Sequence, residues 1–173
     1  QYYYDLAYAD QFSSLFDNTW IGVHPTLTHN QYIVLKLDFS VIRVDNSPAT
    51  IEESFNQHCN SRLITILQRY SQYVEGMNEI SMDVAASDNL DTLLNFLQMN
   101  GAPRVFIIID EYDNFANQLI TGYQDYLYQE LTAEDSFLRT FFKVLKQGRQ
   151  TGAIANIFIT GVLPITIDDL ASG

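Results

Sequence analysis

Apolar and polar residues alternate between Gln31 and Phe39, with Ile33, Leu35 and Leu37 on one side and Lys36 among the residues on the other. This period of two predicts a strand with one wetter face or an edge position. Val105–Ile109 contains no polar residue, as is typical of a strand buried on both faces of a parallel sheet. A third strand is predicted at Ile157–Thr160, where Gly161 closes it.

Helical spacing of apolar residues fills the stretches between these strands. One helix is predicted after a start signal at Ser47 and Pro48, with apolar residues at helical spacing from Ile51 to Tyr70. A second is capped by Asp88 and stopped by Gly101 and Pro103, and a third starts at Thr132–Asp135 and ends at Gly148 or Gly152. Crossovers of this length imply right-handed parallel connections. The pattern therefore predicts an α/β fold built on a parallel sheet.

Charge and composition narrow the function classes. The 173 residues contain 9 Lys and Arg against 21 Asp and Glu, a net charge of −12, which argues against a general nucleic-acid surface. Cys59 is the only cysteine, so an internal disulfide and a zinc cluster of cysteines are excluded. His24, His29 and His58 do not show the spacing expected of metal ligands. No apolar run approaches the roughly 20 residues of a membrane helix. With no secretion signal evident, we expect an intracellular, cytoplasmic protein.

The most informative chemistry is the pair Asp110 and Glu111, directly after the second strand. Acids at the carboxyl end of a buried parallel strand lie where α/β folds bind ligands. In P-loop ATPases such a pair is the Walker B element, in which the first acid holds Mg²⁺ through water and the second activates the attacking water. The alternative interpretation is that both acids are turn residues or caps of the next helix.

Two further segments carry candidate chemistry. Thr160, at the end of the neighbouring strand, is placed to contact a phosphate or the attacking water, although it also fits a role in simply closing the strand. A basic stripe, Arg139, Lys143, Lys146 and Arg149, holds four of the nine positive charges. It suits a phosphate, a nucleic acid or a neighbouring subunit, or else a solvated helix face.

Taken in order, several segments resemble the AAA-ATPase-like domain family. The resemblance spans nearly the whole chain and is carried by Phe16–Gly22, Tyr32–Ser40, Ile109–Asn117, Phe141–Lys146 and Phe158–Gly173. The last of these segments is the most specific. It implies a P-loop ATPase domain of the ASCE type, with a three-layer fold. It further implies that Asp110 is the Mg²⁺ acid, Glu111 the catalytic acid and Thr160 a sensor-like residue. Members of this family often carry a PD-(D/E)XK nuclease-like domain downstream.

One departure from the family pattern is important. The family's phosphate loop, Walker A, would lie just upstream of Gln1, and no Gly-x-x-x-x-Gly-Lys-Ser/Thr segment occurs in this chain. We therefore expect residues 1–173 to be a single, truncated ATPase domain. ATP and Mg²⁺ would be cofactors of the intact protein, whereas this chain alone would hold neither tightly and would be inactive.

The resemblance also implies a strand order. In this fold class the sheet runs 5-1-4-3-2, so the three predicted strands would be strands 2, 3 and 4, side by side, with strand 1 absent. Ile157–Thr160 would then be an exposed edge, open to self-association. Nucleic acid would be involved only indirectly.

Two other functions remain open at this point. The chain would be a protein-interaction or regulatory module without nucleotide chemistry if its aromatic, acidic surface serves a partner. It would be a Mg²⁺-dependent hydrolase without a phosphate loop if Asp110, Glu111 and Asp113 act together.

Overall fold

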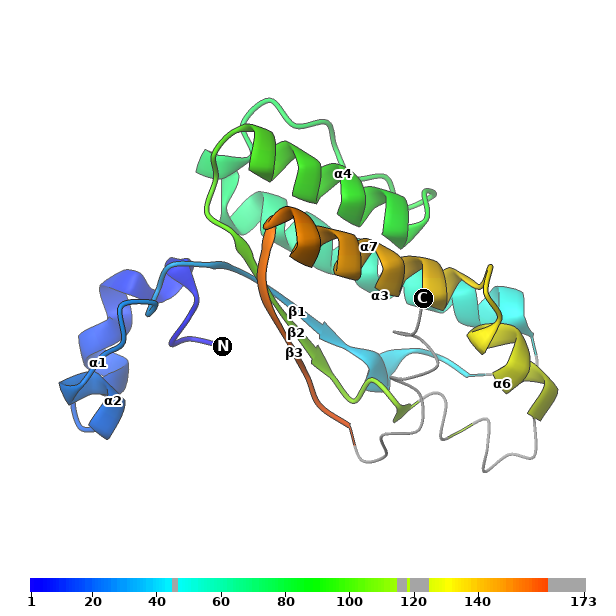
Figure 1. Cartoon of the computed structure of the whole chain (residues 1–173), viewed down its shortest axis with the longest axis horizontal. Helices are drawn as coiled ribbons and strands as arrows, with labels where there is room; N and C mark the ends of the chain where they lie inside the picture. The colour runs from blue at the N-terminus through cyan, green and yellow to red at the C-terminus, as the bar shows by residue number, and fades with distance from the viewer. Residues whose placement is uncertain (45–46, 115–117, 119–124, 162–173) are drawn as a thin grey trace.

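The computed structural model describes residues 1–44, 47–114, 118 and 125–161. Its centre is a three-stranded sheet of β1 (Ile33–Asp38), β2 (Val105–Asp110) and β3 (Ile154–Ile159). All strands are parallel and their order is β1-β2-β3 (Figure 1). The predicted parallel α/β fold and the contiguous strand order are therefore confirmed. Within the described residues β3 pairs only with β2, which leaves it at an edge of the sheet as predicted.

The helices divide into an N-terminal group and a group that follows β1. The N-terminal group is η1 (Leu6–Gln11), α1 (Phe12–Phe16) and α2 (Trp20–Val23). The later elements are η2 (Phe39–Val41), α3 (Pro48–Arg69), η3 (Ser71–Tyr73), α4 (Ala86–Met99), α6 (Asp125–Thr132) and α7 (Phe137–Thr151).

Helices α3, α4 and α7 lie on the same side of the sheet (Figure 1). The side chains that alternate inward from β1 and β2, such as Leu35 and Ile107, are fully buried in one core with Phe55, Leu94 and Phe141 from these helices. This core buries one face of the strands, which fits the alternation in β1, whereas the apolar run of β2 also places Phe106 and Ile108 on the opposite face. Within the described residues no helix covers the other face, so these residues form two of the three layers that the resemblance implies.

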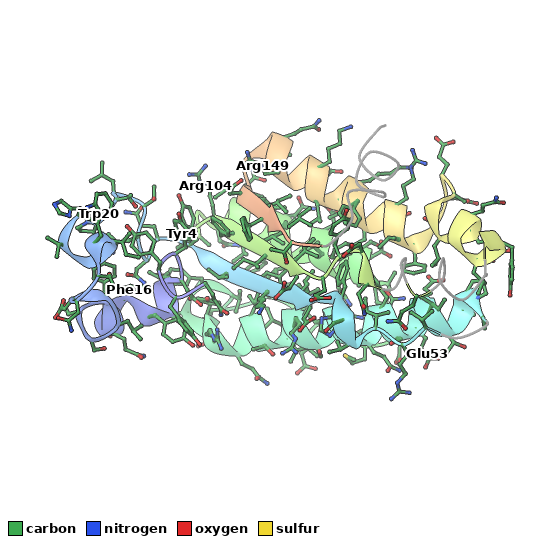
Figure 2. All side chains as sticks on the ribbon, turned by 90° about the horizontal axis from the view of Figure 1, so that it is seen from below. Tyr4, Phe16, Trp20, Glu53, Arg104 and Arg149 are labelled. Atoms are coloured by element: carbon green, nitrogen blue, oxygen red, sulfur yellow. The ribbon has the colours of Figure 1, made fainter. Side chains whose placement is uncertain are left out.

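The opposite face of the sheet is open over much of its area, and Figure 2 looks onto it from below. Phe106 on this face is buried because Tyr4 stacks on it, with 4.9 Å between ring centroids. Phe158, which lies beside Ile108 in the register, is 56% exposed. The N-terminal segment thus covers only the part of this face near the amino ends of the strands.

The N-terminal segment is attached to the sheet through one buried carboxylate. Asp5 is fully buried, and it forms an isolated parallel bridge with Tyr32 just before β1. Its Oδ1 accepts hydrogen bonds from the Tyr70 hydroxyl at 2.6 Å and the Ala7 N–H at 2.9 Å. Its Oδ2 lies 3.6 Å from Arg69 Nη1. Because a buried charge is costly unless it is paired, these contacts determine where residues before β1 dock.

Three predicted boundaries were wrong. Helix α4 begins at Ala86, so Asp88 lies in its first turn and does not cap it. Helix α7 is capped by Ser136, whose Oγ accepts the Arg139 N–H, and the segment 132–135 instead ends α6 and forms the turn after it. Strand β3 begins at Ile154, three residues before the predicted start, and its register with β2 is irregular there, because Val105 pairs with Ile154 and Phe106 with Asn156. Gly152, with φ 84°, ends α7 as one of the two predicted stops.

Candidate functional site

The polar residues of interest gather where the three parallel strands end. Asp38 of β1 is the register partner of Asp110 of β2, and Thr160 follows the last residue of β3. The Thr160 N–H donates to the Ile109 carbonyl at 2.8 Å, which extends the pairing of β2 and β3 to this point. The sheet therefore brings together Asp110 and Thr160, two residues that the sequence analysis selected from separate segments.

Asp110 is held by two neighbouring side chains. The Thr160 hydroxyl donates a short hydrogen bond to its Oδ1, and Lys36 Nζ lies 3.4 Å from its Oδ2. The Thr160 hydrogen bond, followed by Lys36 and the Glu111 N–H, holds the pKa of Asp110 below its ordinary value, although partial burial opposes this. Asp110 is consequently an ionised carboxylate with a defined orientation at the rim of the sheet.

Glu111 begins a tight turn directly after β2. Its φ of 54° lies in the left-handed region, which is unusual for a residue with a side chain, and the residue is exposed. The Tyr112 N–H donates to the Thr160 carbonyl at 3.1 Å, so the turn is held against the end of β3. Such strained residues cluster at functional sites, where the surrounding structure holds them in place.

The turn also packs closely against Gly161. A Cβ at position 161 would lie 2.4 Å from the Tyr112 ring and 2.6 Å from Asp113 Oδ1. Tyr112 and Asp113 are both buried, so neither could move aside easily. The hypothesis of a Mg²⁺-dependent hydrolase grouped Asp113 with Asp110 and Glu111, but Asp113 is a buried residue of this turn.

At the end of β1, Asp38 and His58 form a second polar group. Asp38 Oδ1 accepts the N–H and the hydroxyl of Ser40, while the Asp38 N–H donates to His58 Nε2 at 3.1 Å. Burial and the nearby Arg62 lower the pKa of His58, and Asp38 opposes them. His58 is therefore neutral at pH 7, with Nε2 as the acceptor.

Sequence reasoning missed Lys36 and His58 as neighbours of the acidic residues. The alternation in the first strand places Lys36 on its polar side, and this was the one signal in the sequence that could have pointed to it. Its partner on the next strand depends on the register, however, and the register appears only in the fold.

The side chains at this site suit only a limited contact with Mg²⁺. No group of three His, Cys, Asp or Glu side chains able to hold a metal occurs among the described residues. Asp110 by itself, with its side chain 40% exposed, fits the single water-mediated contact made to a Mg²⁺ ion that phosphate oxygens mainly hold. A metal bound by protein ligands alone does not fit this part of the structure.

The other sequence candidates do not join this site. Two cations of the basic stripe bond locally, because Lys143 Nζ donates to the Glu134 carbonyl at 3.1 Å and Arg149 Nη1 donates to the carbonyls of Ile154 and Ala155. His24 stacks on Trp20 in the N-terminal segment, and His29 contacts Phe12. The C-terminal residues that carried the most specific resemblance, 162–173, lie outside the described part of the chain.

These features define an α/β protein whose parallel sheet presents an acidic pair and a hydroxyl at the carboxyl ends of adjacent strands. The chain belongs to the AAA-ATPase-like family: the family model, described as predicted AAA-ATPase, matches residues 1–171. Neither the comparison with curated proteins nor that with solved structures found a match. Within the described residues, no helix combines the length and apolarity needed to cross a bilayer.

Proposed function

We propose that these residues supply the acidic half of an ATP-hydrolysing site of the P-loop type. The observation that carries the proposal is the arrangement at the end of the central strand. Asp110 is fixed there by Thr160 from the adjacent strand, and Glu111 follows in a strained turn. Family membership supports the same chemistry.

Each residue has a distinct role in this proposal. Glu111 is exposed and is the general base that takes a proton from the attacking water. Asp110, kept ionised by Thr160 and Lys36, would hold the Mg²⁺ of the nucleotide through water. Bound Mg²⁺ would neutralise charge on the phosphates. Thr160 is a positioning residue, because its hydroxyl orients the Asp110 carboxylate.

The phosphate-binding half of such a site is not among these residues. The chain contains no Gly-x-x-x-x-Gly-Lys-Ser/Thr segment, whose backbone N–H groups and Lys would cradle the phosphates. We therefore expect this chain alone to bind ATP weakly.

Substitution of Glu111 tests the proposal. In the full natural polypeptide that contains these residues, Glu111→Gln should retain ATP affinity while lowering the rate of hydrolysis about a hundredfold or more, since a general base contributes roughly 10²–10⁴-fold. Binding is measured with a fluorescent ATP analogue, and hydrolysis by release of phosphate.

Glu79→Gln is the matched control, because Glu79 is also exposed and lies in the loop between η3 and α4. It should leave both quantities unchanged. Unaltered hydrolysis in the Glu111 variant, or an equal loss in the Glu79 variant, would remove the role assigned to Glu111.

A further inference from the structure

A polar cleft of about 210 Å³ lies beside β1, on the edge that faces away from β2. Helix α3 forms its other wall. The polar and charged groups at its surface include Lys36 and Asp38 from β1, together with Arg62, Thr65, Arg69 and Tyr70 from α3 and its C-terminal end. The cleft is separate from the turn that holds Glu111.

The cleft concentrates positive charge in an acidic protein. Lys36, Arg62 and Arg69 are three of the nine Lys and Arg residues in a chain of net charge −12. Asp38 is the one carboxylate among the lining side chains, so their formal charge is +3 − 1 = +2. Cations gathered in one cleft repel each other, and a bound anion would relieve that repulsion.

The three cations differ in how far they are already engaged. Arg69 pairs with Asp5 and lies over the Tyr8 ring, and Lys36 pairs with Asp110. The Arg62 side chain makes no hydrogen bond or ion pair in the part of the chain that the structure describes. Its guanidinium is therefore available to an incoming ligand, and a guanidinium matches the geometry of phosphate oxygens.

The edge of β1 favours a small ligand over a peptide strand. A docking strand would need the outward N–H groups of β1, but the Val34 N–H already donates to the Tyr70 hydroxyl at 3.2 Å and the Asp38 N–H to His58 Nε2 at 3.1 Å. Two of the positions that strand addition would use are thus occupied by side chains.

We propose that this cleft binds a small phosphate-type anion, with Arg62 as the principal contact and Lys36 and Arg69 as supporting cations. Lys36 lines the cleft and also contacts Asp110, so the anion and the Asp110 carboxylate share one ammonium group. Occupation of the cleft therefore weakens the hold of Lys36 on Asp110, and by thermodynamic reciprocity loss of the Asp110 charge strengthens anion binding. The site does not depend on the proposed hydrolysis.

Pyrophosphate is the probe, titrated into the 173-residue chain by calorimetry at low ionic strength. The native chain should bind it saturably, and added salt should weaken the binding. Arg62→Gln should weaken the affinity about tenfold, as expected for loss of a charge-assisted contact. Arg104→Gln, which removes the same charge from an exposed residue outside the cleft, should have little effect. Absence of saturable binding, or equal affinity in the Arg62 and Arg104 variants, would overturn the proposal.

A second pair of variants tests the sharing of Lys36. Asp110→Asn and Glu111→Gln remove the same charge from adjacent residues, but only Asp110 contacts Lys36. Asp110→Asn should tighten pyrophosphate binding by several-fold, whereas Glu111→Gln should not. Equal affinities in the two variants would show that Lys36 does not link the cleft to Asp110. Loss of hydrolysis by Glu111→Gln in the full natural polypeptide, together with unchanged pyrophosphate binding by Glu111→Gln in the 173-residue chain, would support two sites that act independently.

Discussion

Tyr70→Phe removes a single hydroxyl that joins three parts of the fold. The Tyr70 side chain is buried just after α3, where its hydroxyl donates to Asp5 Oδ1 at 2.6 Å and accepts the Val34 N–H at 3.2 Å. Phenylalanine preserves the ring and its packing. The variant therefore isolates the contribution of the hydroxyl to the docking of the N-terminal segment.

The expected loss follows from these contacts. Asp5 is fully buried, and a hydrogen bond to a charged group contributes about 1.5–3 kcal/mol. Asp5 would keep the Ala7 N–H and the ion pair with Arg69, which limits the penalty. The Val34 N–H would lose its hydrogen-bond partner, but Val34 lines the cleft, where water can replace the hydroxyl. We expect the free energy of unfolding to fall by about 2–3 kcal/mol.

Urea denaturation at pH 7 measures this change, with an unchanged m value expected because the fold is preserved. Tyr2→Phe is the control, since Tyr2 is 48% exposed, and it should change stability by less than about 0.5 kcal/mol. A loss in Tyr70→Phe no larger than in this control would refute the reasoning.

The same hydroxyl affects stability in alkali. Burial, with the Asp5 hydrogen bond, raises the pKa of Tyr70 above its ordinary value of 10.0. The unfolded chain then releases the Tyr70 hydroxyl proton at a lower pH than the folded chain does. The contribution of this hydroxyl to stability is therefore fully present below pH 10 and declines as the pH rises further. Tyr70→Phe should show a shallower decline than the native chain.

Two further titrations test the polar groups at the strand ends. Because the pKa of His58 is lowered from 6.5 in the folded state, its contribution to stability should be fully present above pH 6.5 and should be lost as the pH falls through the folded-state pKa. His58→Gln should therefore flatten the decrease in urea midpoints between about pH 7 and 5. An unchanged slope would show that His58 does not titrate differently on folding. Thr160→Val should raise the pKa of Asp110 toward 3.8 in a carboxyl-carbon NMR titration, whereas Thr160→Ser should keep it low. Identical titrations in the two Thr160 variants would contradict the role of the hydroxyl.

The strands of the sheet were predictable because side chains alternate between the two faces of a strand, and this alternation is visible in the sequence. The alternation around Lys36 and the unbroken run of Val105–Ile109 identified two strands and their parallel packing. Asp110 and Glu111 could be placed at the sheet rim because they follow a buried strand directly. The start of β3 was missed, since the bulge near Ala155 breaks the period on which such reasoning depends.

The sequence by itself determined the parallel α/β architecture, the order of the three strands under the family topology, and the position of the acidic pair. Those properties depend on residues close together in the chain, together with the direction in which parallel strands run. Only the tertiary structure showed that Lys36 pairs with Asp110, that Tyr70 holds Asp5, and that Arg62 faces a cleft at the sheet edge. These contacts join residues far apart in the sequence. Register and helix packing bring them together, and neither leaves a local pattern in the chain.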